Sequence, residues 1–333
     1  MTKSEKRSWL YSQEKEEIKR VDEAGYYIYR LAATGHTVCE HRIKLGLDTP
    51  VELAFIADPH LNINSVEDEA DEELYNTRRC RPHFRDGEGI VPFMNALNLA
   101  ETADVTVVLG DVLDYMTRGT VDFLKRWVIE PNPDIIMNVA DHDITKEVLT
   151  DRDDLLSYEE RLGTLAAAWP HDVDYFVKKI GRLRVISLNS ERECYGGLYD
   201  RLKAEIEDAR AKSEYIIICQ HRPLATGDAA YADLMTCFTN HPYCNQRNFY
   251  DAEEIIGSPN YGYERSNKLY KLITESADVI AAVFNGHYHN QFYTRIKATK
   301  PDGNGTKDAY IPQHTVPCAQ TYDKGYVMRV IIE

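Results

Sequence analysis

The segment "VELAFIADPH", residues 51–60, starts as an apolar run and ends with an aspartate and a histidine, Asp58 and His60. An apolar run of this length with little polar alternation is typical of a β-strand that is covered on both faces. Similar runs recur along the chain: "DVTVVLG" (104–110), "DIIMNVA" (134–140), "RVISL" (184–188), "YIIICQ" (215–220) and "VIAAVFNG" (279–286). Helical patterns lie between these runs, so the order of elements predicts an α/β layer architecture.

The clearest helical pattern is "LYDRLKAEIEDARAK", residues 198–212, which has charged residues around one apolar face. The apolar face consists of Leu198, Leu202, Ile206 and Ala209. Towards the end of the chain, "QFYTRIK" to "YVMRVIIE" predicts several strands, with turns at "PDGNG" and "YDKG".

The first 50 residues differ from this rhythm. We expect residues 1–50 to form a charged arm, helical or frayed, and a β-hairpin made of "GYYIYRL" and "HTVCEHRIKL". This part would pack on a main domain of residues 51–333. Two long segments without periodicity, 61–90 and 222–262, are predicted insertions in that domain, and loops of such length are usually functional or mobile.

Composition limits the classes of function. The chain has 333 residues and a net charge of −15, which argues against broad binding of nucleic acid or anionic membranes, although a local basic cluster can reverse the sign. Neither an apolar membrane span nor the h-region of a secretory signal is present in the sequence. Seven scattered cysteines without a CxxC pair predict free thiols in a reducing cytoplasm, and Cys237 and Cys244 are the pair to check for metal or disulfide. The sequence gives no indication of the oligomeric state.

Aspartate and histidine residues directly follow five of the predicted strands. They are Asp58 and His60, Asp111 and Asp114, Asp141 and His142, His221, and His287 and His289. Because ligands of open α/β sheets bind at the carboxyl ends of strands, we expect these side chains to converge. Imidazole and carboxylate groups together bind zinc, manganese, iron or nickel, and there are too many of them for one tetrahedral ion. A pair of ions about 3.5–4 Å apart would suit displacement at phosphorus.

Taken in order, the motifs resemble those of the calcineurin-like metallophosphoesterase superfamily: DxH, GDxxD, GNHD or GNHE, H, and GHxH. The corresponding segments are "DPH", "GDVLD", "ADHD", "QH" and "GHYH", and the resemblance covers residues 51–333. It implies a four-layer α/β/β/α sandwich with two mixed β-sheets. It also implies a metal-dependent phosphoric ester hydrolase with two divalent metal ions (Mn, Zn, Fe or Ni) and a small phosphorylated substrate.

The resemblance divides the metal ligands into two sets that share one carboxylate. The first set is Asp58, His60 and His289, the second is Asp141, His221 and His287, and the shared ligand is Asp111. His142 would not bind metal but would lie near the scissile phosphate as an electrophile or general acid. Asp114 would orient it, because a carboxylate fixes the tautomer of a histidine and stabilises its charged form.

One motif departs from the family pattern. Asp141 occupies the position of the usual asparagine, and Ala140 that of the usual glycine. A carboxylate binds a borderline or hard cation at least as well as an amide oxygen does, so we expect the second metal to be retained. The extra negative charge should weaken the Lewis acidity of the ion. Alanine should be tolerated provided that its φ is negative.

Substrate-contacting residues are harder to predict. Tyr115, where the protein Ser/Thr phosphatases have arginine, and Asp114, where purple acid phosphatases have tyrosine, argue against those two subfamilies. Arg222, next to a candidate ligand, is the best candidate for a substrate contact. Further candidates are the rim residues Asn189 and Tyr195. The arginines of the first insertion would suit a second phosphate or a nucleotide, but the sequence favours a solvated basic patch that pairs with the preceding acidic run: Arg78, Arg79, Arg81 and Arg85.

Two other functions stay open at this point. The same site would serve a nuclease or a nucleotide pyrophosphatase. Alternatively, the altered third motif would mark a catalytically weakened interaction scaffold, although loss of function usually removes several ligands.

Overall fold

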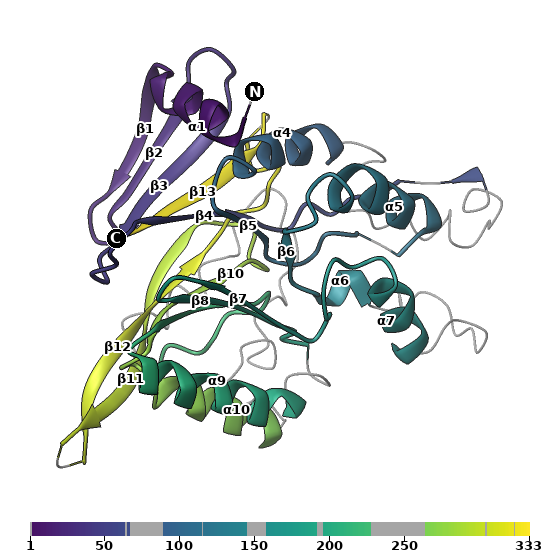
Figure 1. The fold of residues 1–333 in the computed structure, drawn as a ribbon. Coiled ribbons are helices and arrows are strands. Elements are labelled where there is room, and N and C mark those ends of the chain that lie inside the picture. The colour runs from purple at the N-terminus through teal and green to yellow at the C-terminus, as the bar shows by residue number, and fades with distance from the viewer. Residues whose placement is uncertain are drawn as a thin grey trace.

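The computed structural model describes residues 2–63, 65–66, 89–114, 116–144, 158–191, 196–227, 264–303, 305–322 and 324–333. Two β-sheets lie face to face and helices cover their outer faces (Figure 1). Helix α4 (Ile90–Ala100) packs on the first sheet, and α9 (Tyr199–Lys212) and α10 (Glu264–Thr274) pack on the second. This arrangement is the predicted four-layer α/β/β/α sandwich.

The first sheet is mixed and has seven strands. Their order is β1 (Lys15–Val21), β2 (Tyr26–Leu31), β3 (Thr37–Ile43), β13 (Tyr326–Ile332), β4 (Val51–Ile56), β5 (Val105–Val108) and β6 (Ile136–Met137). Strands β4, β5 and β6 are parallel, whereas β13 runs antiparallel to β4. The two runs expected to form a hairpin, β2 and β3, pair antiparallel.

The second sheet is also mixed and has six strands. Their order is β11 (Phe292–Asp302), β12 (Gly305–Thr315), β10 (Ile280–Asn285), β9 (Tyr215–Cys219), β8 (Leu183–Leu188) and β7 (Tyr175–Ile180). The central strands β8, β9, β10 and β12 are parallel. Parallel strands with both faces covered explain the continuous apolar runs of the sequence.

The remaining helical segments lie between strands, except α1, which precedes β1. They are α1 (Lys3–Ser12), α5 (Arg118–Phe123), the π-helix η1 (Leu124–Ile129), α6 (Asp141–Ile144), α7 (Tyr158–Ala166) and the 3₁₀-helix η2 (Gly196–Leu198). The predicted apolar face of α9 is confirmed, because Leu202, Ile206 and Ala209 are buried.

Three apolar clusters correspond to the three boundaries between layers. The middle cluster lies between the sheets, where the rings of Phe55 (β4) and Phe284 (β10) stack with centroids 4.0 Å apart. Offset and stacked aromatic pairs add about 0.5–1.5 kcal/mol to the burial of apolar area. This packing holds the carboxyl ends of β4 and β10 beside each other, and both strands carry candidate ligands.

Three details differ from the sequence prediction. Residues 15–21, expected in the arm, form strand β1, which pairs antiparallel with β2; its alternating pattern is hidden because most of its side chains are exposed at the sheet edge. Strand β7 was not predicted. Strand β6 is only two residues long, shorter than the predicted run 134–140. The next residue, Asn138, donates its backbone N–H to the carbonyl of Val108 in β5 (2.8 Å), and its side-chain amide donates to Ser187 Oγ (2.7 Å) and to the carbonyl of Cys219 (2.9 Å).

None of the helices in the described ranges could span a membrane. Several predictions lie outside the described residues: most of the two insertions, Cys237 and Cys244, Tyr115 and Tyr195, and Arg78, Arg79, Arg81 and Arg85. Cys39, Cys219 and Cys318 are free and buried.

Candidate metal centre

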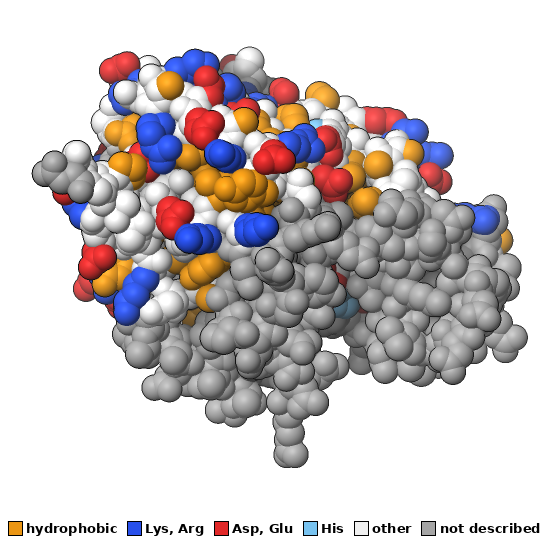
Figure 2. All heavy atoms as spheres, turned by 90° about the horizontal axis from the view of Figure 1, so that it is seen from below, with side chains coloured by type: hydrophobic (Ala, Val, Ile, Leu, Met, Phe, Trp, Pro, Cys, Tyr) orange, Lys and Arg blue, Asp and Glu red, His pale blue; other side chains and the backbone are white. Residues whose placement is uncertain are grey.

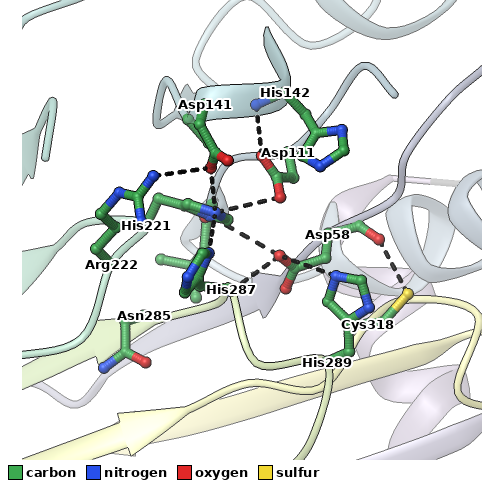
Figure 3. Close-up of polar contacts among 12 residues, drawn as sticks. Asp58, Asp111, Asp141, His142, His221, Arg222, Asn285, His287, His289 and Cys318 are labelled. Carbon is green, nitrogen blue, oxygen red and sulfur yellow. Dashed lines mark hydrogen bonds and ion pairs between the residues drawn. The ribbon is translucent and has the colours of Figure 1, made fainter. Parts of the chain in front are cut away.

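All the candidate ligands follow parallel strands at their carboxyl ends. Asp58 and His60 follow β4, and Asp111 follows β5. Asp141 begins α6 just after β6, His221 follows β9, and His287 and His289 follow β10. Because the first three strands belong to one sheet and the last two to the other, the residues meet between the sheets, and Figure 3 shows all of them except His60 under their labels. The sequence prediction that these side chains converge agrees with this geometry.

Five of these residues have a left-handed backbone. The φ values are 48° for Asp58, 42° for His60, 48° for Asp111, 72° for His287 and 53° for His289. This conformation costs about 1–2 kcal/mol for a residue with a side chain. Backbone strain of this kind clusters at functional sites, where the surrounding structure holds it.

Gly110 and Ala140 lie in contact beside the ligands. Gly110 has a φ of 88°, and a Cβ atom there would lie 2.8 Å from both the Cβ of Ala140 and Nδ1 of His221, so only glycine fits. Among the described residues, Ala140 is not one of those with positive φ. The condition for replacing the usual glycine by alanine is therefore met.

The first ligand set is Asp58, His60, Asp111 and His289, which are all buried. Nε2 of His60 lies 2.9 Å from Nε2 of His289 and 3.6 Å from Oδ2 of Asp111. Oδ1 of Asp58 lies 3.8 Å from Nε2 of His289. Four ligand atoms from three strand ends therefore surround one point.

The second ligand set is Asp111, Asp141, His221 and His287. Nε2 of His221 lies 3.1 Å from Nδ1 of His287, 3.2 Å from Oδ2 of Asp111 and 3.5 Å from Oδ1 of Asp141. Oδ2 of Asp111 is therefore close to a histidine of each set, which is the geometry of a bridging carboxylate. Its other oxygen, Oδ1, accepts from the backbone N–H of His142 (3.2 Å).

The spacing of the side chains fits metal ions. Two nitrogen ligands bound at about 2.0–2.1 Å to a tetrahedral ion lie about 3.4 Å apart, close to the distances in both sets. Nδ1 of His221 lies 2.9 Å from the carbonyl oxygen of Leu109, which can only accept, so Nδ1 carries the proton and Nε2 has its lone pair towards the second set. Within the described residues, the buried Oδ2 of Asp58 has no hydrogen-bond partner. A buried carboxylate oxygen of this kind is what a bound cation would satisfy.

His142 lies beside both sets. Its Nδ1 lies 3.0 Å from the carbonyl oxygen of Asp114 and 3.4 Å from the carboxylate Oδ1 of the same residue. The same Oδ1 is 3.3 Å from Nδ1 of His60. Asp114 thus contacts one histidine of the first ligand set and His142, which is 20% exposed at its side chain. The predicted contact between Asp114 and His142 is present.

Neighbouring carboxylates and imidazoles in the centre shift one another's pKa values. Burial opposes charging of His142 and His221, but the adjacent carboxylate of Asp111 overcomes this and raises the pKa of both imidazoles well above the usual value. Burial opposes the ionisation of Asp111 as well, yet His221 holds its pKa well below the usual range. Burial raises the pKa of Asp58 to about 8. Metal ions would compete with these protons, because ligands bind in their deprotonated form.

Arg222 lies at the edge of the second set and is only 5% exposed. Its Nε and Nη2 are 3.2 and 3.3 Å from the two carboxylate oxygens of Glu191, and Nη2 is 3.5 Å from Oδ1 of Asp141. Asn189, the described rim candidate, is buried and donates to Asp174 Oδ1 (3.1 Å).

The sequence prediction missed three residues that hold the centre together. Asp143 accepts from the backbone N–H groups of Leu113 (2.8 Å) and Ala140 (2.9 Å), which ties two ligand loops to each other. Sγ of Cys318 lies 3.0 Å from the carbonyl oxygen of Asp58. Glu191 pairs with Arg222. Asp143 alone had a signal in the sequence, since it belongs to the third motif.

Comparison with known proteins identifies the family. The calcineurin-like phosphoesterase family matches residues 51–291. The match covers well over half of the chain, and the chain belongs to this family. No curated protein matches the sequence significantly.

Solved structures with a similar fold are distant in sequence. A purple acid phosphatase from yellow lupin (Lupinus luteus) seeds is 13% identical with a TM-score of 0.43, and the alignment covers 92% of this chain and 48% of that protein. A dimetal phosphatase from Danio rerio is 12% identical with a TM-score of 0.39, and the alignment covers 81% of this chain and 88% of that protein. The chain therefore spans about half the length of the lupin enzyme.

Proposed function

We propose that the protein is a metal-dependent phosphoesterase that hydrolyses a phosphomonoester or a phosphodiester. The observation that carries this proposal is the pair of ligand sets that share Oδ2 of Asp111, with His142 beside them. Membership of the calcineurin-like phosphoesterase family supports the same activity.

The residues fit two divalent ions, with manganese, zinc, iron or nickel as the candidates for this donor set. Asp58, His60 and His289 would hold one ion, Asp141, His221 and His287 would hold the other, and Asp111 would bridge them. When bound, such a pair supplies Lewis acidity and an activated water for in-line attack at phosphorus.

His142 would act on the substrate itself. Its Nδ1 faces the backbone carbonyl of Asp114, which can only accept, so Nδ1 carries a proton, and Nε2 is the nitrogen that would act on the substrate. Burial opposes the charge of His142, but the carboxylate of Asp111 and the hydrogen bond with Asp114 raise its pKa well above the usual value, which favours a proton on Nε2 as well. It can donate this proton to the leaving oxygen, or a hydrogen bond to a phosphoryl oxygen as charge develops there. Asp114 orients the ring.

A panel of substrates tests the proposal. Protein stripped with a chelator and reloaded with each of the four metals would be assayed on p-nitrophenyl phosphate, bis-p-nitrophenyl phosphate, nucleotides and oligonucleotides. We expect metal-dependent turnover of a mono- or diester. Preference for oligonucleotides or dinucleoside polyphosphates would indicate the nuclease or pyrophosphatase alternative, and full metal loading without turnover of any ester would contradict the proposal.

The surface and the cysteines bear on partners and location. On the face in Figure 2, the lysines and arginines of the described residues are interspersed with aspartates and glutamates, and the net charge is −15. We therefore propose a small phosphorylated substrate rather than a nucleic acid.

The buried free thiols of Cys39, Cys219 and Cys318 agree with the proposed location in a reducing cytoplasm.

The scaffold alternative predicts little bound metal. All seven candidate ligands are present in the two sets, including Asp141. Metal analysis of the purified protein separates the two readings, since a scaffold would bind less than one ion per chain.

A further inference from the structure

A chain of charged side chains runs from the second ligand set into the protein. Nη2 of Arg222 lies 3.5 Å from Oδ1 of Asp141 (Figure 3) and 3.3 Å from one carboxylate oxygen of Glu191, while Nε lies 3.2 Å from the other oxygen of Glu191. Arg222 and Glu191 are 5% and 7% exposed. A buried arginine between two carboxylates is costly to remove, because both carboxylates then lose their shared cation.

The position of Arg222 is fixed by its own backbone. Its N–H donates to Oγ of Ser190 (3.0 Å), and its carbonyl accepts from Nε2 of Gln220 (2.6 Å). Ser190 and Glu191 lie beyond the carboxyl end of β8, and Arg222 lies beyond that of the neighbouring β9. The planar guanidinium is thus delivered to Asp141 by two paired strands rather than by a loose surface side chain.

Asp141 is also the residue that departs from the family pattern. The usual asparagine is neutral, whereas aspartate adds one negative charge to a ligand set that already contains Asp111. Its Oδ1 atom lies 3.5 Å from both Nη2 of Arg222 and Nε2 of His221. The same oxygen atom of Asp141 therefore lies next to a histidine of the second ligand set and next to the guanidinium of Arg222.

We propose that Arg222, held by Glu191, is a positioning residue that adapts the second metal site to an aspartate: it balances the added charge of Asp141 and holds Oδ1 towards His221. This inference rests on the proposed metal site, and it places Arg222 behind a ligand rather than against the substrate. Residues 141 and 222 must then be energetically coupled.

A double-mutant cycle in chelator-treated protein measures this coupling without any metal or activity. The variants are Asp141→Asn, Arg222→Gln and the double substitution, compared by thermal unfolding. We expect Arg222→Gln to lower the Tm by roughly 6 °C or more in the wild-type background, and by about half as much in the D141N background. Equal losses in both backgrounds would overturn the proposal.

Arg184 provides a matched control. It is a buried arginine on β8 that pairs with Glu205, Asp208 and Glu214 instead of a candidate ligand. The substitution Arg184→Gln should lower the Tm by the same amount in the wild-type and D141N backgrounds. If R222Q alone does not fold, folding of D141N/R222Q supports the coupling. If neither folds, Arg222→Lys replaces R222Q in the same cycle.

A second measurement separates positioning from substrate contact. In titrations with Mn²⁺, R222Q should tighten binding of the second ion in the D141N background, where the arginine faces the cation without a carboxylate. The gain in Mn²⁺ affinity should be at least about threefold larger in the D141N background than in the wild-type background. In the wild-type background, R222Q also removes the group that positions Oδ1 of Asp141, and this loss offsets the gain. An equal gain in affinity in both backgrounds would contradict the proposal. Two results together would instead show that Arg222 contacts the substrate. R222Q would raise KM equally in both backgrounds, and the losses of Tm in the double-mutant cycle would be additive.

Discussion

The protein buries histidines in two different surroundings, and their pKa values move in opposite directions. His221 lies at the metal centre, where burial opposes its charge but Asp111 raises its pKa well above the usual value. His314 lies in the second sheet, stacked on Phe284 with centroids 4.6 Å apart, and there burial, followed by the nearby His41, lowers its pKa well below the usual value. Burial alone therefore does not tell a ligand from a core histidine; the neighbouring carboxylates do.

The largest effect is expected from removal of Asp111, the proposed bridging carboxylate. Asp111→Asn should reduce metal content to one ion or less per chain and lower kcat/KM by about 10³-fold or more, since several kcal/mol of charge stabilisation are lost. Elemental analysis and kinetics measure both. Asp104→Asn is the matched control, because Asp104 directly precedes β5, the strand that Asp111 follows, and pairs with Arg7. Full activity of D111N would contradict the prediction, because the surroundings of His221 would then not differ from those of His314 by a carboxylate that matters for function.

Next in size is the effect at His142. His142→Asn should lower kcat by about 10²–10⁴-fold, the usual contribution of a general acid, while both metals stay bound. Asp114→Asn should lower kcat less, because the backbone carbonyl of Asp114 still holds Nδ1 of His142. Loss of metal in H142N would show that His142 is a ligand. His41→Gln, which changes a histidine outside the centre, serves as the control.

For the core histidine, His314, we expect an effect on the stability of the fold rather than on activity. Unfolded His314 takes up a proton below about pH 6.5, whereas the folded protein keeps it neutral, so stability falls as the pH drops below 6.5. The loss approaches about 1.4 kcal/mol per pH unit. Urea unfolding of wild type and His314→Gln between pH 7.5 and about 5 measures it. The variant should show a shallower fall, and identical slopes would contradict the assignment.

The smallest expected effect is that of Asp141→Asn. Both metals should remain bound, because an amide oxygen can still act as a ligand. The ions should become more electrophilic, so the acidic limb of the activity profile should move to lower pH by less than about one unit. A pH–rate profile with metal analysis tests this. Loss of the second ion in D141N would show that the charge of Asp141 is needed for binding.

The sequence alone determined which residue types stand at the candidate site and where that site lies in the fold. Apolar runs that end in Asp58, Asp111, His221 and His287 indicated buried parallel strands with candidate ligands at their carboxyl ends. This was possible because covered strands have a simple apolar pattern, and because the spacing within each motif is local. The edge strand β1 and strand β7 were missed, and β6 is shorter than the predicted run 134–140, since the limits of these strands depend on contacts with distant residues.

Only the tertiary structure decided how the side chains meet. The left-handed backbone of Asp58, His60 and Asp111, the sharing of Oδ2 between two ligand sets, and the pairing of Arg222 with Glu191 have no local signature. They arise because β8 and β9 are neighbours in one sheet, and the other sheet, with β4, β5 and β6, packs against it. The residue types at each strand end can be read from the chain itself, whereas the packing of the two sheets determined which atoms face one another.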